Sequence, residues 1–139
     1  MNAECYNPPL QTTIRLATVI NFSGGTMAEI KNVTDATYHQ EVTASKVPVI
    51  VDLWAPWCQP CKAINKDLEA ISETYKRSVR VVKVNVDENP VLVGSLEIRS
   101  VPTILFYAGN GASPVSIVGA TTAKQMVAKF RLAELPAAI

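Results

Sequence analysis

Apolar and polar positions alternate in blocks from residue 30 onward, and the blocks predict strands and helices in turn. The run 49–54 is almost continuously apolar, which is typical of a strand buried on both faces, and Asp52 is its one acidic residue. The run 79–86 is mostly valine and predicts a second interior strand. Between these runs, apolar residues at spacings of four, three and four predict an amphipathic helix: Ile64, Leu68, Ile71 and Tyr75.

The flanking segments extend this pattern to the end of the chain. Helical stretches are expected at 34–45, at 89–96 and at 121–135, each next to a proline or a capping residue. Two β-rich runs, 103–107 and 115–118, flank a glycine-containing segment and predict a hairpin. Strands that first alternate with helices pair in parallel, and a terminal hairpin adds antiparallel strands. The sequence therefore predicts an α/β domain with a central mixed β-sheet flanked by helices on both faces.

Residues 1–26 lack the pattern of the remaining chain. Pro8–Pro9 and Gly24–Gly25 interrupt regular structure there, and no period of 2 or 3.6 is sustained. We expect a flexible N-terminal extension, with Cys5 as an unpaired exposed thiol, followed by a single domain at 27–139. No stretch approaches the roughly 20 apolar residues that span a bilayer, and no secretory leader is recognisable. Export and membrane insertion are therefore not expected.

Composition and charge narrow the classes of function. Of 139 residues, 48% are hydrophobic and 18% are charged, which is a globular composition. The net charge of +1 supplies no broad basic face, so neither nucleic acid nor a membrane surface is an expected partner. Three cysteines and one histidine suit neither a secreted disulfide framework nor most zinc sites. The composition favours a domain from a reducing compartment, without a bound metal.

Cys58 and Cys61 are the chemically most informative residues, because they lie between the buried strand and the amphipathic helix. Two cysteines three positions apart at a helix start can close a small disulfide ring. The helix dipole and free backbone N–H groups there favour a thiolate, which predicts Cys58 as the nucleophile. Cys61, one turn deeper, is placed to displace the product from the mixed disulfide. Half of a zinc site and a pair of core thiols are the alternatives for a bare C-x-x-C.

The segment 51–62 resembles the active-site signature of the thioredoxin family nearly position for position, and the resemblance extends over about residues 30–135. It implies the thioredoxin fold and a protein-disulfide oxidoreductase with a redox-active Cys58–Cys61 disulfide. The implied role is a reductant of disulfide-containing target proteins, which serves electron transport and cell redox homeostasis. Thioredoxin reductase is the implied electron donor. We expect a cytoplasmic monomer that needs no metal or organic cofactor.

Two charged residues in the predicted strands have roles that the resemblance implies. Asp52 matches a buried aspartate that accepts the proton of Cys61 as that thiol attacks, and burial raises the pKa of such a carboxyl. The alternative is an edge aspartate that hydrogen-bonds to local backbone. Lys83 matches a lysine that tunes the charge of this aspartate. Its alternative is a lysine whose stem lines the strand while its ammonium reaches solvent.

The target-binding surface is also assigned by resemblance. The Val101–Pro102 bond is expected to be cis and to face the cysteines, and a trans proline at the start of a strand is the alternative. Gly119 either permits a turn or lets the backbone of a partner approach. Trp57 offers a flat apolar surface beside the reactive sulfur. The residues assigned to target binding are Trp57, Gln59, Pro60, Val101, Pro102 and Gly119.

Three residues depart from the family pattern. Gln59 stands where glycine is usual, and the dipeptide between the cysteines influences how oxidising the pair is. Lys66 replaces a common proline, and Ser100 replaces a frequent glycine before Val101. Two other classes of function therefore remain open: a non-catalytic binding subunit that uses the same surface, and an oxidase or isomerase tuned by the Gln-Pro dipeptide.

Overall fold

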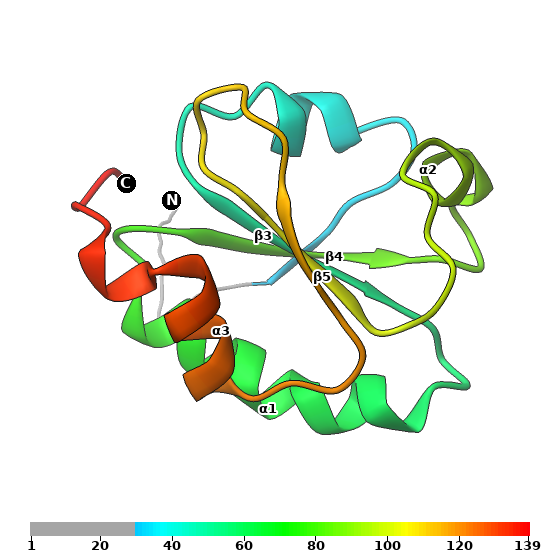
Figure 1. Cartoon of the computed structure of the whole chain (residues 1–139). Coiled ribbons are helices and arrows are strands. Elements are labelled where there is room, and N and C mark those ends of the chain that lie inside the picture. Colours follow the sequence, from blue (N-terminus) through cyan, green and yellow to red (C-terminus); the bar gives the residue numbers. More distant parts are fainter. Residues whose placement is uncertain (1–29) are drawn as a thin grey trace, which may run out of the picture.

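The computed structural model describes residues 30–139 and contains a five-stranded sheet (Figure 1). The extension expected over 1–26, with Cys5, lies outside the described residues. The strands are β2 (Lys31–Asn32), β3 (Val49–Trp54), β4 (Arg80–Asn85), β5 (Thr103–Tyr107) and β6 (Val115–Val118). Their order across the sheet is β2-β4-β3-β5-β6. Strands β2, β4 and β3 run parallel, whereas β5 and β6 are antiparallel to their neighbours, which confirms the mixed sheet.

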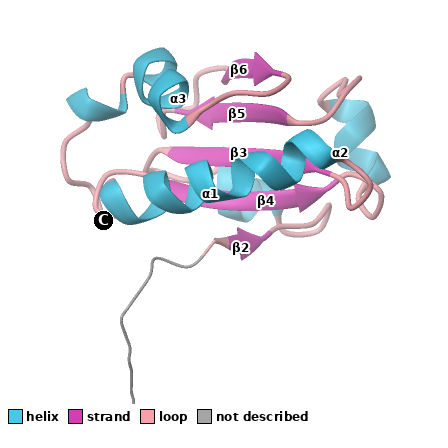
Figure 2. Ribbon diagram, turned by 90° about the horizontal axis from the view of Figure 1, so that it is seen from below, coloured by secondary structure: helices cyan, strands magenta, loops and turns pink. Residues whose placement is uncertain are grey.

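Helices cover both faces of this sheet (Figure 2). On one face lie α1 (Gln59–Thr74) and α3 (Ala123–Phe130), and on the other lie the π-helical turn η2 (His39–Thr43) and α2 (Pro90–Ser95). The period-two alternation of β3 explains why the strand is apolar throughout. Val49, Val51 and Leu53 pack toward η2 and α2, whereas Ile50 packs toward α1 and α3. Asp52 shares the Ile50 face, which is the face that α1 covers.

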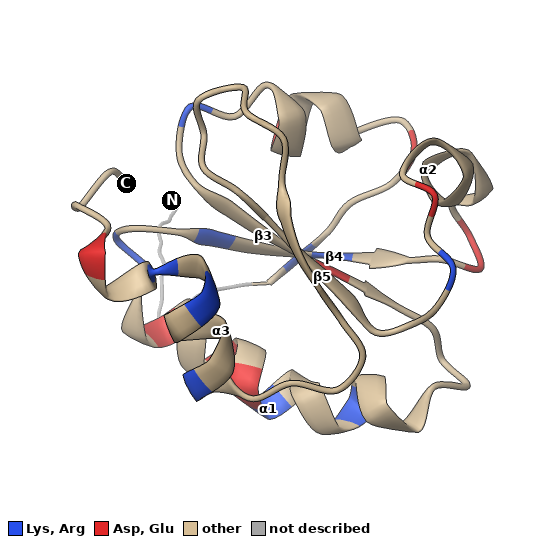
Figure 3. Cartoon of the chain, viewed as in Figure 1, with Lys and Arg blue, Asp and Glu red and all other residues tan. Residues whose placement is uncertain are grey.

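The predicted stripe on α1 is the side that packs on the sheet. Ile64, Leu68 and Ile71 are buried against it, while Tyr75 caps the helix and is partly buried. The charged residues of α1 lie on its remaining surface, with the lysines in the first half of the helix and the acidic residues after them, as Figure 3 shows. No helix among the described residues is long and apolar enough to cross a membrane.

Two predicted helices are shorter than expected. The stretch 34–45 forms only a turn followed by η2, and the closing helix ends at Phe130 instead of continuing to 135. Arg131 takes a left-handed conformation (φ 56°, ψ 43°), and a 3₁₀ turn, η3 (Leu132–Glu134), follows. Residues two apart lie on different sides of a continuous helix. The break at Arg131 therefore lets both Phe130 and Leu132 enter the core, where they are 3% and 1% exposed.

The topology brings several chain segments to one edge of the sheet. The parallel strands β3 and β4 end at the same edge, so the segments that follow Trp54 and Asn85 are neighbours. Because β5 is antiparallel to β3, its first residue, Thr103, lies at this edge and is preceded by Pro102. Strand β6 is antiparallel to β5 and returns to the same edge, where Gly119 follows it. Helix α1 also begins there, directly after Cys58.

Candidate active site

Cys58 and Cys61 form a disulfide at the amino end of α1. Their Cα atoms are 5.3 Å apart, a separation that a disulfide spans without backbone movement. Cys58 occupies the N-cap position in extended conformation, and Cys61 lies in the first turn. Both side chains pack with Ala55, against the partly buried Trp54 and Val101. The predicted pairing is thereby confirmed.

The backbone of α1 provides a hydrogen bond to the sulfur of Cys58. The Cys61 N–H donates to Cys58 Sγ over 3.2 Å, so the sulfur takes the place of an ordinary capping oxygen. Pro60 lies in this first turn, where its missing N–H costs no helical hydrogen bond. An N–H donor and the positive end of the helix dipole stabilise a thiolate at Cys58. Cys58 and Cys61 are 4% and 1% exposed, so Cys58 is the more accessible residue of the pair.

Asp52 is fully buried on the face of the sheet that α1 covers. Neither carboxylate oxygen has a hydrogen-bond partner among the described residues, so the alternative of an edge aspartate bonded to local backbone is wrong. Burial raises the pKa of Asp52 to about 7, against an opposing contribution from the positive charge of Lys83. A carboxyl group with this pKa exchanges a proton near neutral pH.

Lys83 is the partner of Asp52 in the register of β3 and β4. Its side chain is partly buried, and its Nζ lies 5.0 Å from the centre of the Trp54 ring. The ammonium therefore faces the π-surface of the indole, in a cation–π arrangement. Trp54 in turn packs against the cysteine pair. Lys83 therefore contacts Trp54, and Trp54 contacts the group that contains the disulfide.

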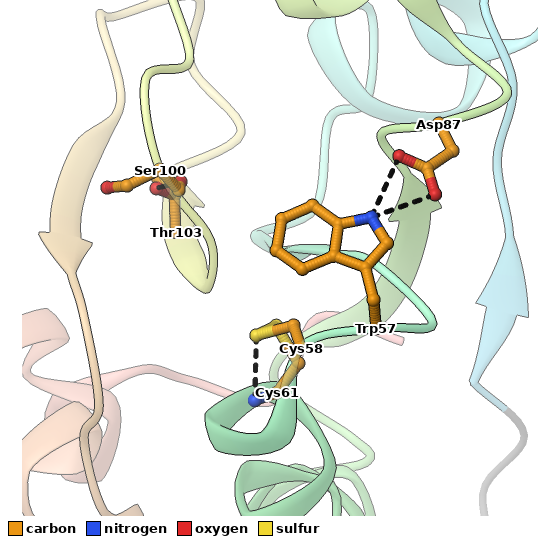
Figure 4. Close-up of a disulfide and its surroundings, with 6 residues drawn as sticks. All are labelled: Trp57, Cys58, Cys61, Asp87, Ser100 and Thr103. Carbon is orange, nitrogen blue, oxygen red and sulfur yellow. Dashed lines mark hydrogen bonds between the residues drawn. A yellow bond between two sulfur atoms is a disulfide. The ribbon is translucent and has the colours of Figure 1, made fainter.

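Trp57 is the exposed aromatic residue of the site, with 68% of its surface accessible. Its indole Nε1 donates to Asp87, at 3.1 Å to Oδ2 and 3.3 Å to Oδ1 (Figure 4). The sequence analysis did not identify Asp87. The pattern that would have found it is the shared edge of the sheet: Asp87 follows β4 just as Trp57 follows β3. Two carboxylate oxygens on one indole N–H hold the ring beside Cys58.

The Val101–Pro102 peptide bond is cis, as the sequence predicts. Val101 packs against the group formed by Ala55, Cys58 and Cys61, so this segment faces the disulfide. The Pro102 carbonyl accepts the Gly119 N–H at 2.9 Å, which joins the segment to the end of β6. Gly119 has φ +94°, and a Cβ built on it would meet no atom within 4 Å. Gly119 thus provides both a turn and open space above its backbone.

The remaining predicted positions lie in the same region or clearly outside it. Gln59 and Pro60 are exposed on the first turn of α1, beside the disulfide. His39 lies on η2, which packs on the opposite face of the sheet, and its Nδ1 is 2.7 Å from Thr43 Oγ1. Within residues 30–139, no three His, Cys, Asp or Glu side chains come together as metal ligands. The arrangement supports exchange chemistry at sulfur.

Several known proteins that this chain resembles are named thioredoxins. The family model described as thioredoxin matches residues 29–131. Thioredoxin 1 of Nostoc sp. is 43% identical over 106 residues, covering 74% of this chain and 98% of that protein. The M-type chloroplastic thioredoxin of Spinacia oleracea is 39% identical over 106 residues, covering 76% of this chain and 58% of that protein. The solved structure of Malassezia sympodialis thioredoxin aligns with a TM-score of 0.66 at 32% identity, covering 75% of this chain and 90% of that chain.

Proposed function

Because this chain belongs to the thioredoxin family, we propose that it works as a reductant of disulfides in other proteins. It is a thiol–disulfide oxidoreductase, and Cys58 and Cys61 are its redox-active pair. The observation that carries the proposed direction of attack is the hydrogen bond from the Cys61 N–H to Cys58 Sγ. This donor stabilises the thiolate of Cys58 once the pair is reduced.

In the first step the Cys58 thiolate attacks one sulfur of a target disulfide. A new bond forms between Cys58 and that sulfur, and the target disulfide breaks, so that the second target cysteine leaves as a thiolate. Trp57 and the 101–102 segment border Cys58 and support the target chain during this attack. Gly119 is partly exposed, and the open space beside its backbone has room for an extended segment of the target.

In the second step Cys61 resolves the mixed disulfide. The Cys61 thiol gives its proton to Asp52, and the resulting thiolate attacks Cys58 Sγ. The Cys58–Cys61 disulfide forms, the bond to the target breaks, and the target leaves with both cysteines reduced. Two electrons have then passed from this chain to the target. The position of Asp52 on the face covered by α1, and its pKa of about 7, support this role.

The wider setting follows from the same resemblance. We propose thioredoxin reductase as the donor that reduces the Cys58–Cys61 disulfide, a monomeric working state and a cytoplasmic location. The redox domain spans 27–139 in this proposal, with 1–26 as an extension that the exchange chemistry does not need. Electron transport and redox homeostasis are the corresponding cellular roles.

Substitution of each cysteine tests the two steps separately. Cys58→Ser removes the attacking sulfur, so insulin-disulfide reduction with dithiothreitol as donor should fall to the uncatalysed rate. Cys61→Ser keeps the attacking sulfur and removes the resolving one. Mixed disulfides with targets should therefore accumulate, and an excess of dithiothreitol should reduce them. Normal turnover by Cys58→Ser would overturn the proposal, and a Cys61→Ser protein that traps no target would contradict the division of labour.

A further inference from the structure

A hollow of about 140 Å³ lies between Trp57, the chain neighbour of the reactive Cys58, and the loop that carries Ser100. Figure 4 shows where Trp57, Cys58 and Ser100 lie. One water molecule occupies about 30 Å³, so the hollow has room for about four or five non-hydrogen atoms. That is the size of one aliphatic side chain. Its wall is mostly apolar, and the lining residues are Trp57, Val86, Val93, Ile98, Arg99, Ser100 and Val101.

Arg99 is the one charged residue that lines this hollow. Its side chain is exposed, and no described carboxylate lies within 4.0 Å of it. Asp87, which lies behind the Trp57 ring, directs both carboxylate oxygens to the indole N–H. The guanidinium therefore keeps its five N–H donors available to an incoming group.

Two acidic residues flank Arg99 without forming an ion pair with it: Glu97, which lines an adjoining hollow together with Arg99, and Asp87, which is bonded to Trp57. The whole chain has a net charge of +1, and acidic and basic residues are mixed over the described elements (Figure 3). With no strong general field, the preference for one target segment over another depends on charges within about one Debye length of the disulfide.

We propose that this hollow and Arg99 together select targets that carry an aliphatic side chain next to the attacked cysteine and an Asp or Glu one residue farther. The aliphatic side chain fills the apolar hollow, and the carboxylate pairs with the Arg99 guanidinium at its rim. This inference rests on the proposed function, since it concerns the same encounter of Cys58 with a target disulfide. It adds a charge preference to that encounter.

Three synthetic disulfide-bonded peptides provide the test. Each has Leu next to the attacked cysteine, and the following residue is Glu, Gln or Lys. The fully reduced protein is mixed with each peptide, and the second-order rate constant of a single turnover is measured at low salt and at 0.5 M NaCl. We expect the Glu peptide to react about three to ten times faster than the Lys peptide at low salt, and the ratio to fall toward one at high salt.

Two variants of Arg99 assign the preference to this residue. Arg99→Gln should remove the Glu-to-Lys ratio, and Arg99→Glu should invert it. Arg77→Gln is the matched control, because it removes the same charge from an exposed position beyond the far end of α1, about 24 Å of helix away. The control should keep the full ratio.

The peptides also separate this inference from the proposed function. If the wild-type protein fails to reduce the Gln peptide, the proposed function is wrong. If it reduces the Gln peptide but shows no Glu-to-Lys ratio at low salt, only the charge preference is wrong. A ratio that persists in Arg99→Gln, or that Arg77→Gln also loses, overturns the assignment to Arg99.

Discussion

At the scale of the residue, Asp52 carries an energetic cost that its chemistry explains. The carboxylate is fully buried and has no described hydrogen-bond partner, so the folded chain favours its protonated form. Its pKa rises from 3.8 to about 7 in the folded state. Because the pKa is raised in the folded state, the contribution of Asp52 to the free energy of unfolding is most favourable below pH 3.8. This contribution is lost as the pH rises through 7. Above that window both states carry the charge, and the loss is complete.

Asp52→Asn should therefore stabilise the protein at alkaline pH. A shift of this size corresponds to about 4 kcal/mol between the two ends of the window, so we expect a gain of about 2–4 kcal/mol at pH 8.5. At pH 4 the gain should be within about 1 kcal/mol, because Asp52 is then protonated. Urea unfolding of the oxidised protein at both pH values measures this. A gain that is equal at pH 4 and pH 8.5 would contradict the raised pKa.

Asp87 holds the exposed ring of Trp57, and this contact predicts an effect on target binding. Asp87→Ala removes both acceptors of the indole N–H, so the ring samples other orientations and the KM for a peptide disulfide should rise about two- to fivefold. The value of kcat should change little, since no reacting atom is touched. Asp87→Asn loses the charge but keeps an acceptor oxygen, and it should restore most of the affinity. The NMR shift of the Trp57 indole N–H reports the bond directly. Equal KM values in both variants would show that charge matters and the hydrogen bond does not.

The site residues that sequence reasoning finds are those whose type is unusual for their place. A carboxylate inside an apolar strand and two cysteines at a helix start are visible without coordinates. Asp87 and Val93 are ordinary residues for a loop and a short helix, and only the packing of segments distant in the chain brings them to Trp57. Their roles depend on contacts between distant segments, which local patterns do not contain.

At the scale of the element, α2 shows how a short helix depends on a distant segment. Its N-cap residue, Asn89, makes no capping hydrogen bond, and its side chain instead accepts the Asp35 N–H at 2.8 Å and donates to the Asn85 carbonyl at 2.9 Å. The Asp35 carboxylate caps the helix, accepting the N–H groups of Leu92 at 2.9 Å and Val91 at 3.3 Å. A carboxylate at a helix N-terminus also interacts favourably with the helix dipole.

Asp35→Ala should consequently destabilise the fold and disturb the site. Loss of a capping side chain costs about 0.5–2 kcal/mol, and we expect about 1–2 kcal/mol because two backbone N–H groups lose their acceptor. Helix α2 carries Val93 to the hollow beside Trp57, so the KM for peptide disulfides should also rise. Asp35→Asn keeps an oxygen acceptor and should cost less than half as much in urea unfolding. An unchanged free energy of unfolding in Asp35→Ala would show that α2 forms without this cap.

The elements themselves are largely predictable, because most have strong local patterns. The runs 49–54, 103–107 and 115–118 coincide with β3, β5 and β6. The ends of helices are less predictable: the left-handed turn at Arg131 follows from the need to bury both Phe130 and Leu132, which is a tertiary requirement. Strand β2 has two residues, and only its pairing with β4 defines it.

At the scale of the whole molecule, two apolar clusters on opposite faces of the sheet hold the fold together, and neither contains a cysteine. The redox pair belongs to a smaller group with Ala55 at the edge of the sheet. The fold should therefore persist when the disulfide is reduced. This separation of core and site lets the pair change redox state without unfolding the domain.

The disulfide should nevertheless change the free energy of unfolding, through two opposing contributions. Closing a loop with a sequence separation of 3 removes chain entropy from the unfolded state and stabilises the oxidised protein by about 2 kcal/mol. The start of α1 stabilises the Cys58 thiolate of the reduced protein by about 0.5–1 kcal/mol. We expect the oxidised form to be the more stable by about 1–2 kcal/mol in urea unfolding at pH 7, with the same folded spectrum for both forms.

The same difference must appear in the redox equilibrium, because folding and oxidation form one thermodynamic cycle. An advantage of about 1–2 kcal/mol for the oxidised protein makes the Cys58–Cys61 disulfide about five- to thirtyfold more stable in the folded chain than in the unfolded chain. Equilibration with glutathione, once in buffer and once in 8 M urea, measures this ratio independently of the unfolding curves. The disulfide would be more stable in the unfolded chain only if the stabilisation of the thiolate by α1 exceeded the entropic contribution of the closed loop. That result would contradict the expected values. It would mean that the start of α1 stabilises an anion more strongly than one hydrogen bond and a helix dipole explain.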